Sequence, residues 1–316
     1  MKGLTDIAGI RVGHASDYEA LTGCTVILCE KGAVAGVDIR GGATGTEEMD
    51  VMSPFHLAPQ VHAVVLAGGS AFGLEAASGV RRWLEQKGIG FQTGAAVVPI
   101  VPCAILYDLA IGKAGVRPTR EMGEAAAAAA SDGPVAEGAV GAGTGATVGK
   151  ALGMAHAMKS GIGTFTVELP GGVKVSALVA VNAWGDVVDP RGGRIVAGTR
   201  KSPGSREFAN SAELMKTRAA EGIPGRNTTL AVVATNARLG KVQAARLAQM
   251  GQQGLVRAIS PVHTSLDGDL CIGLSAGALE ARPDALGVAA AEAVAQAVLR
   301  AVRKARTLGG VPGLAG

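Results

Sequence analysis

Thr229-Leu-Ala-Val-Val-Ala-Thr-Asn236 is an apolar and largely β-branched run of strand length. Gly222, Pro224 and Gly225 lie just upstream, and residues of these types interrupt regular structure. The pattern predicts a buried central strand. Thr228 would be the first residue of that strand.

The bond between Asn227 and Thr228 therefore lies at a strand start. If this bond were cut, Thr228 would carry a free α-amine beside its hydroxyl, and an unperturbed α-amine has a pKa of roughly 7.7–8.0. Such an amine can take the hydroxyl proton at neutral pH, so nucleophile and base would be one residue. The alternative is that Asn-Thr-Thr is only a polar lead-in to the strand, and other parts of the chain have to distinguish the two interpretations.

The composition indicates a well-buried globular protein. Of 316 residues, 48% are hydrophobic and 18% are charged, which allows a substantial core. Aromatic residues make up only 3%, whereas 48 residues are glycine. The core must therefore consist of Val, Ala, Leu and Ile, with close approach between backbones.

Charge and hydropathy argue against nucleic acid and membrane partners. The net charge is +4 and the pI is near 9.0, but the basic residues are scattered. Their one cluster, Arg300 to Arg306, follows a helix-like pattern and has no stacking aromatic residues around it. We find no apolar leader at the N-terminus and no uncharged apolar run of membrane-spanning length. We expect a cytoplasmic protein.

The cysteines and histidines do not predict a metal or another cofactor. Cys24, Cys29, Cys103 and Cys271 lack metal-binding spacings and are expected to be buried free thiols in a reducing compartment. The five histidines are isolated from one another, without the HxH or HxxxH spacing of common zinc sites.

Strand-like and helix-like segments alternate along the chain. Strands are predicted over 25–28, 33–39, 61–67, 95–101, 164–169, 174–182 and 270–274, in addition to 229–236. Helices are predicted from Ser70, as N-cap, to about residue 87, and over 119–131, 206–220, 241–250 and from residue 284. The Glu30-Lys31-Gly32 segment is predicted to be a turn, and 190–225 an exposed linker. Paired strands and paired long helices favour helices layered over antiparallel or mixed sheets.

Two known signatures nearly match and fail on specific residues. A nucleotide-binding P-loop ending at Gly149-Lys150 would need Gly at 144 and Ser or Thr at 151, where the chain has Thr144 and Ala151. Gly273-Leu-Ser275-Ala-Gly277 matches the nucleophile elbow of α/β-hydrolases, but the last histidine, His263, precedes the serine. The serine is therefore predicted to be a turn residue.

Several polar residues lie where burial would be costly. They end or begin apolar runs, or close the glycine-rich segment, and they are Tyr107, Asp108, Lys150, Asn182, Asp267 and Asp269. Each is either exposed at a strand end or part of a common site.

Motifs in a fixed order resemble one family of enzymes. The motifs are Asp38-Ile-Arg-Gly-Gly42, Leu66-Ala-Gly-Gly-Ser-Ala-Phe-Gly-Leu-Glu75, Ile105-Leu-Tyr-Asp108, Gly141-Ala-Gly143 through Gly149-Lys150, Asn227-Thr-Thr229 with Ala234-Thr-Asn236, and Pro261-Val-His-Thr-Ser-Leu-Asp-Gly-Asp269. In these motifs the chain resembles the self-processing N-terminal-nucleophile hydrolases that include L-aminopeptidase/D-esterase, the β-peptidyl aminopeptidases and the nylon-oligomer (6-aminohexanoate oligomer) hydrolase.

The resemblance implies a fold and a processing event. The fold would be α/β (α+β), a four-layer αββα sandwich of the N-terminal-nucleophile-like kind, with residues 1–316 as a single hydrolase domain. The precursor would cut itself between Asn227 and Thr228 into fragments 1–227 and 228–316. The nylon-oligomer branch looks nearest, because its nucleophile is Thr where other members use Ser. Arg226 departs from the smaller residue expected before the asparagine, which leaves the efficiency of cleavage open.

The resemblance also implies roles for the polar residues. The Thr228 hydroxyl would attack an amide carbonyl, with its freed amine as general base and then as acid for the leaving amine. Lys150 would keep that amine neutral through its positive charge. Asn182 and, less directly, Tyr107 would donate hydrogen bonds to the oxyanion.

The two aspartates and the expected substrates complete this assignment. Asp267 and Asp269 would orient the Thr228 amine or bind a substrate ammonium, and both carboxylates lie on one side if the segment is extended. The expected activity is hydrolysis of small peptides or amides with a free amine, without a cofactor, by a homo-oligomer of four or more chains.

Two other functions stay open. One is acyl transfer of the ornithine acetyltransferase kind, which shares a similar fold and a Thr nucleophile. The other is an unprocessed, non-catalytic protein that binds a small molecule, in which Arg226 prevents cleavage.

Overall fold

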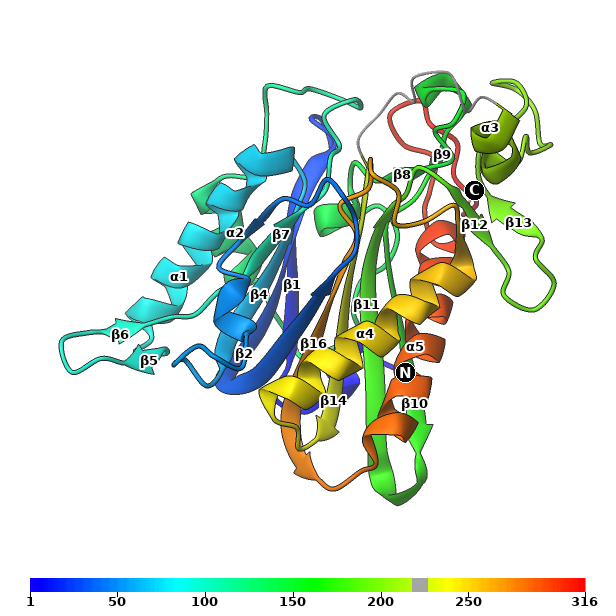
Figure 1. Cartoon of the computed structure of the whole chain (residues 1–316). Helices are drawn as coiled ribbons and strands as arrows, with labels where there is room; N and C mark the ends of the chain where they lie inside the picture. The colour runs from blue at the N-terminus through cyan, green and yellow to red at the C-terminus, as the bar shows by residue number, and fades with distance from the viewer. Residues whose placement is uncertain (218–226, 316) are drawn as a thin grey trace.

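The computed structural model describes residues 1–217 and 227–315, with the strands and helices shown in Figure 1. Arg226, the end of the helix predicted over 206–220 and the end of the predicted linker lie outside the described residues. Within that linker, α3 (Ser211–Thr217) confirms part of the predicted helix.

Two sheets share one long strand (Figure 1). The first sheet has the order β10-β11-β14-β16-β2 and the second β1-β2-β4-β7-β3. Their bounds are β10 (Ile162–Leu169), β11 (Val173–Asn182), β14 (Thr228–Ala237), β16 (Leu270–Leu279), β2 (Thr22–Ile39), β1 (Arg11–Asp17), β4 (Val61–Ala67), β7 (Cys103–Ile105) and β3 (Thr46–Glu47). The β14–β16 and β4–β7 pairs are parallel, and the other pairs are antiparallel.

Alternate residues of β14 enter different cores, because successive side chains of a strand face opposite sides. Leu230, Val232 and Ala234 belong to the core between the two sheets. Ala231 and Val233 belong to the core under α4 (Lys241–Ala258) and α5 (Pro283–Arg303). The strand therefore separates a helix layer from the second sheet.

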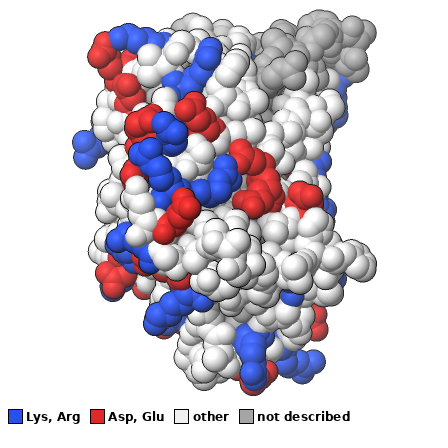
Figure 2. Space-filling model, turned by 90° about the vertical axis from the view of Figure 1, so that its left-hand side faces the viewer, with Lys and Arg blue, Asp and Glu red and all other residues white. Residues whose placement is uncertain are grey.

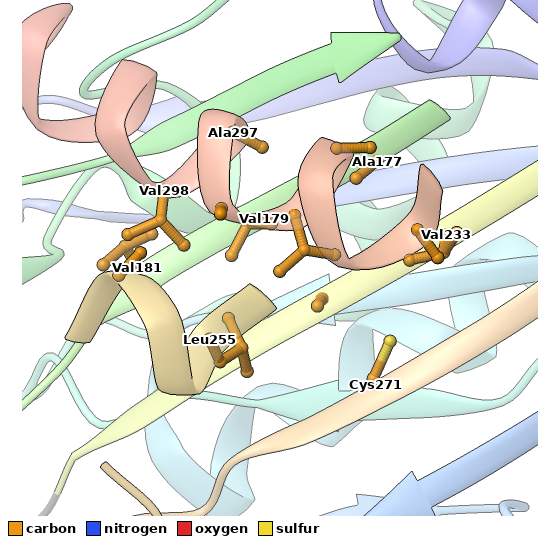
Figure 3. Packing of buried hydrophobic residues seen from close by; sticks show 14 of the residues in the cluster. Ala177, Val179, Val181, Val233, Leu255, Cys271, Ala297 and Val298 are labelled. Carbon is orange, nitrogen blue, oxygen red and sulfur yellow. The ribbon is translucent and has the colours of Figure 1, made fainter. Parts of the chain in front are cut away.

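The second sheet is covered on its outer face by α1 (Ala76–Gln86) and α2 (Arg120–Ala128). The order of layers is helices, sheet, sheet, helices, which confirms the predicted αββα sandwich. Figure 3 shows the first of the helix–sheet cores, where Val298 of α5 and Leu255 of α4 meet Val179 and Val181 of β11. Cys24, Cys29, Cys103 and Cys271 are buried and free, as predicted.

Glycines bring the helices close to the sheets. A Cβ at Gly36 of β2 would lie 2.1 Å from the backbone nitrogen of Ala245 in α4, and one at Gly273 of β16 would lie 2.3 Å from the carbonyl oxygen of Ala244. Such distances are far below van der Waals contact, so only glycine permits this packing. At these two positions the structure confirms the prediction that glycines allow close approach between backbones.

The remaining elements are short. They are η1 (Leu4–Asp6), η2 (Asp50–Met52), η3 (Ser70–Glu75), η4 (Gly141–Gly143), η5 (Met154–His156), η6 (Pro170–Gly172), β5 (Phe91–Gln92), β6 (Val97–Val98), β8 (Thr147–Val148), β9 (Met158–Lys159), β12 (Asp186–Val188), β13 (Ile195–Ala197) and β15 (Ile259–Ser260). The strand predicted over 95–101 is thus reduced to β6.

The turn predicted at Glu30–Gly32 is wrong, because β2 is one continuous strand. Its pairing with β4 shifts register between Leu28 and Ala33, and Gly32 has φ 82°. The residues that indicate a turn form a bulge instead. Before the bulge β2 pairs with β1 and β4. After it β2 keeps one pair with β4, at Ala33 and Val61, and then pairs with β16, so the strand passes from one sheet to the other near this irregularity.

Ser70 and Ser275 also differ from their predicted roles. Ser70 begins η3 with φ 56° and is not an N-cap, and the α-helix begins only at Ala76. Ser275 is a residue of β16, where its Oγ accepts from the Leu239 N–H at 3.0 Å and donates to the Ala237 carbonyl at 2.7 Å. It is a structural strand residue rather than a turn residue.

The helix α5 is the one described helix that is long and apolar enough to cross a membrane by length and composition. Its mean hydropathy reaches 1.5, yet 72% of the same window is buried inside the protein. Because its apolar residues pack on β10 and β11 and against α4, the composition of α5 is that of a core helix.

Basic and acidic residues alternate on the face that carries α1 and α2 (Figure 2). Arg81 and Arg82 of α1 pair with Glu47 and Glu124, respectively. This face therefore carries no continuous patch of one sign.

Candidate active site

Thr228 is the first residue of β14 and lies opposite Asn182, the last residue of β11. It is 2% exposed. By strand alternation its side chain lies on the same side as that of Leu230, toward the core between the sheets. The predicted nucleophile therefore lies at the end of a central strand, with the polar residues of neighbouring elements around it.

The carbonyl oxygen of Asn227 has two donors. The Thr228 hydroxyl donates to it at 2.5 Å, and the backbone N–H of Gly268 donates to it at 2.8 Å. A Cβ at Gly268 would lie 2.6 Å from the Thr228 Oγ, so the glycine backbone contacts the hydroxyl directly. The sequence interpretation missed Gly268, and the signal for it was a glycine between two aspartates.

Lys150 uses three hydrogen bonds to tie together the ends of β11 and β14. Its Nζ donates to the backbone carbonyl of Asn182 at 3.0 Å, to Asn182 Oδ1 at 2.8 Å and to Asn227 Oδ1 at 2.9 Å. Burial lowers the pKa of Lys150 to about 7, against the opposing effect of the nearby Asp267 carboxylate. Lys150 therefore titrates near neutral pH.

Asn182 is fixed by contacts on both sides of its amide. Its Oδ1 also accepts the N–H of Thr147 at 3.1 Å, and its Nδ2 donates to the backbone carbonyl of Tyr107 at 2.8 Å. Tyr107 therefore contacts Asn182 through its backbone carbonyl. The proposed oxyanion roles of Asn182 and Tyr107 stay predictions, because the described donors to the Asn227 carbonyl are Thr228 and Gly268.

Each aspartate of the Asp-Gly-Asp segment is held by one preceding residue. Asp269 Oδ2 accepts the N–H of His263 at 3.0 Å and lies 3.1 Å from its Nδ1, and Asp267 Oδ2 accepts the N–H and Oγ1–H of Thr264 at 2.9 and 2.6 Å. The other oxygen of Asp269 accepts the Thr229 N–H at 2.6 Å. Asp269 therefore orients the backbone immediately after Thr228.

The charge of Asp269 also affects the ionisation of Asp267. Burial raises the pKa of Asp267, and the nearby charge of Asp269 raises it further. His263 and Thr264, which supply the hydrogen bonds to this pair, were not singled out as site residues from the sequence.

A cavity of about 120 Å³ adjoins Asn227. Its wall is mostly apolar and includes Tyr107, Ile111, Gly145, Thr147, Lys150 and Met154. The cavity therefore lies next to the bond between Asn227 and Thr228.

A second buried lysine supports the loop behind this cavity. Lys159 is fully buried and donates to the carbonyls of Gly143, Ala146 and Ser160 at 3.2, 2.6 and 2.8 Å. Burial lowers the pKa of Lys159 to about 7, and the nearby Asp108 opposes this shift. Asp108 itself accepts from Thr22 Oγ1 at 2.8 Å and from the Gly69 N–H at 2.7 Å.

Within residues 1–217 and 227–315, no group of three or more His, Cys, Asp or Glu side chains is arranged to hold a metal ion.

Known proteins match the chain over nearly its whole length. The sequence pattern of peptidase family S58 matches residues 2–315. An uncharacterized aminopeptidase of Mycobacterium leprae is 40% identical, over 99% of this chain and 93% of that protein. A 6-aminohexanoate-oligomer endohydrolase of Kocuria sp. is 32% identical, over 94% of this chain and 85% of that protein. Of these two relatives, the mycobacterial protein is the more similar to this chain.

The fold is shared with a solved structure. The L-aminopeptidase D-Ala-esterase/amidase of Ochrobactrum anthropi, described as a variant of the Ntn hydrolase fold, superposes with a TM-score of 0.73. The match covers 98% of this chain and 88% of that one at 22% sequence identity. These findings confirm the resemblance recognised in the sequence motifs.

Proposed function

Because this chain belongs to peptidase family S58, whose members are peptidases and amidohydrolases, we propose that it cuts its own Asn227–Thr228 bond and then uses Thr228 as an N-terminal nucleophile. Its substrates would be small peptides or amides with a free amine. The observation that carries this proposal is the position of the Thr228 hydroxyl, 2.5 Å from the carbonyl oxygen of the bond to be cut.

Self-cleavage begins with attack of the Thr228 Oγ on the carbonyl carbon of Asn227. The carbonyl oxygen becomes an oxyanion, and the Gly268 N–H that already bonds it at 2.8 Å stabilises the developing charge. When the tetrahedral intermediate collapses, the C–N bond breaks, the Thr228 nitrogen takes up the proton that the hydroxyl gave up, and an ester links Asn227 to the Thr228 Oγ. Water then hydrolyses the ester, giving the Asn227 carboxylate and a free Thr228 hydroxyl and amine.

Hydrolysis of a substrate repeats this chemistry with the new amine as base. The Thr228 amine accepts the hydroxyl proton as the Oγ attacks, and it returns a proton to the leaving amine. Asp269 holds the Thr229 N–H and thereby the direction of the first residues of β14. A protonated Lys150 nearby disfavours the ammonium form of the Thr228 amine and so lowers its pKa. The amine then stays neutral at neutral pH and is free to accept the hydroxyl proton.

Substitution of Thr228 tests this function. Thr228→Ala removes the nucleophile, so the chain should stay whole and hydrolyse no aminoacyl p-nitroanilide, whereas Thr228→Ser keeps a hydroxyl and should still be processed. The readouts are gel analysis of the purified protein and release of p-nitroaniline from a panel of substrates. A cleaved and active Thr228→Ala protein would falsify the proposal.

A further inference from the structure

The backbone of Asn227 is bound on both sides by the segment around Asp267. It forms a parallel bridge with Asp267. Its N–H donates to the Leu266 carbonyl at 3.1 Å, and its own carbonyl accepts the Gly268 N–H at 2.8 Å. The backbone of residues 266–268 therefore binds both sides of a single α-residue, as in a parallel bridge.

The side chain of Asn227 extends to the cavity. Its Oδ1 accepts a hydrogen bond from Lys150 Nζ at 2.9 Å, and the residue forms part of the cavity wall with Ile111 and Met154. Its Nδ2 is buried and has no hydrogen-bond partner among the described residues. The other two bonds of the Lys150 ammonium go to Asn182. Withdrawal of Asn227 after cleavage would free one buried donor on Lys150.

In the proposed function the Thr228 hydroxyl attacks two carbonyl groups, that of Asn227 during self-cleavage and that of the substrate during hydrolysis. Resting on the proposed function, we infer that the acyl residue of the preferred substrate takes the place of Asn227. It is an L-α-aminoacyl residue with a short side chain that ends in a hydrogen-bond acceptor, and the asparaginyl residue fits best. Its amine donates to the Leu266 carbonyl, its scissile carbonyl accepts the Gly268 N–H, and its side-chain oxygen accepts from Lys150.

Other acyl residues lose one or more of these contacts. A β-aminoacyl or 6-aminohexanoyl group has extra carbons between amine and carbonyl and cannot match the spacing of Leu266 and Gly268. A D-residue directs its side chain away from Lys150. Leucine has nearly the shape of asparagine but no acceptor, and it leaves the buried Lys150 donor without a partner, which is costly.

The experiment measures kcat/KM of the processed protein for the p-nitroanilides of L-asparagine, L-leucine, D-asparagine, β-alanine and 6-aminohexanoic acid. L-Asparagine should exceed L-leucine by at least about tenfold, since one hydrogen bond to a charged group is lost. It should exceed the other three by about 100-fold or more, since backbone contacts are lost as well. A faster reaction with β-alanine, 6-aminohexanoic acid or D-asparagine, or an equal one with L-leucine, would overturn the inference.

A cavity-wall variant provides an independent test. Met154 lines the cavity and belongs to none of the groups proposed to take part in the chemistry. Met154→Ala should raise the kcat/KM for L-glutamine p-nitroanilide relative to L-asparagine at least about threefold, because the cavity gains room for one methylene. An unchanged ratio would place the acyl side chain elsewhere and contradict the inference.

The mass of the protein distinguishes failure of this inference from failure of the proposed function. A protein that is cut before Thr228 and prefers another acyl residue overturns the inference alone. A protein that stays whole and hydrolyses none of the five anilides overturns the proposed function, and the inference with it.

Discussion

Gly268 brings backbone to a place that no other residue could occupy. Its N–H donates to the carbonyl oxygen of Asn227 at 2.8 Å, and a Cβ on this residue would lie 2.6 Å from Thr228 Oγ and 2.9 Å from the Ala43 carbonyl oxygen. Thr228 could avoid an added methyl group only by rotating its hydroxyl away from this position, and the contact with Ala43 is with its backbone. Under the proposed function, the absence of a side chain at residue 268 is therefore needed to keep the Thr228 hydroxyl in place for attack.

Gly268→Ala should therefore slow self-cleavage about 100-fold or more, the scale expected when a reacting atom is displaced by roughly 1 Å. The time course of the uncut band on a denaturing gel gives the rate. Gly115→Ala is the matched control, because a Cβ at Gly115 meets no atom within 4 Å. If the two variants were processed equally fast, Gly268 would have no role in positioning the hydroxyl.

The sequence identified most of the residues around the Asn227–Thr228 bond but not their contacts. Thr228, Lys150, Asn182 and Asp269 do gather at the ends of β11 and β14, because polar residues that end apolar runs in adjacent strands meet at one edge. Gly268 was missed because it contributes a backbone N–H, a group that nearly every residue type has, so the sequence does not indicate this contact. The partner of Asn182 Nδ2 is likewise a backbone carbonyl that no pattern predicts.

At the scale of elements, small residues decide how helices meet the sheets. The helix α4 was predicted over 241–250, yet it runs to Ala258. Gly251 and Gly254 look like helix stops, but a Cβ at either would meet Cys271 Sγ at 2.8 Å or the Ala291 carbonyl at 2.4 Å. Packing on β16 and α5 overrides the weak helix preference of glycine. The bulge in β2 also depends on tertiary structure. Its residues are typical of a turn, and only the pairing of β2 with strands of both sheets shows that they form a bulge instead.

Gly36→Ala should force α4 away from β2, because the new Cβ would lie 2.1 Å from a backbone nitrogen. We expect a loss of about 1–3 kcal/mol in the free energy of unfolding, as for other overpacked cores. Guanidinium denaturation in the uncleaved Thr228→Ala background measures it. The control is Gly204→Ala, whose Cβ meets no atom within 4 Å. Equal stability of the two variants would show that α4 is not held at this distance.

At the scale of the whole molecule, buried ionisable groups set the pH dependence of stability. Burial lowers the pKa values of Lys150 and Lys159 from 10.5 to about 7, so above pH 7 the unfolded chain binds more protons than the folded one. Stability then rises with pH. Burial raises the pKa values of Cys24 and Cys29 from 9.0 to about 12, and those of Cys103 and Cys271 also rise. Above pH 9 the unfolded chain loses these thiol protons first, and stability falls.

The free energy of unfolding should therefore increase from pH 7 to a maximum near pH 9, with each lysine contributing up to about 1.4 kcal/mol per pH unit. Guanidinium midpoints of the uncleaved Thr228→Ala protein, measured under reducing conditions, provide the profile. Lys159→Met in that background should make the rise between pH 7 and 9 less steep, leaving the contribution of Lys150, even though it weakens the fold by removing three bonds to carbonyls. A flat or falling profile for the parent over this range would contradict the assignment.

The most direct test of the central claim is the intact mass of freshly purified protein under denaturing conditions, with N-terminal sequencing of each species. Self-cleavage predicts two chains, roughly 22 and 9 kDa by proportional division of 31.4 kDa, the smaller of which begins at Thr228. Their masses should sum to that of the precursor plus one water, and Thr228→Ala should give the precursor alone. A wild-type chain that persists at 31.4 kDa while hydrolysing aminoacyl amides would contradict the claim, because Thr228 would then have no free amine.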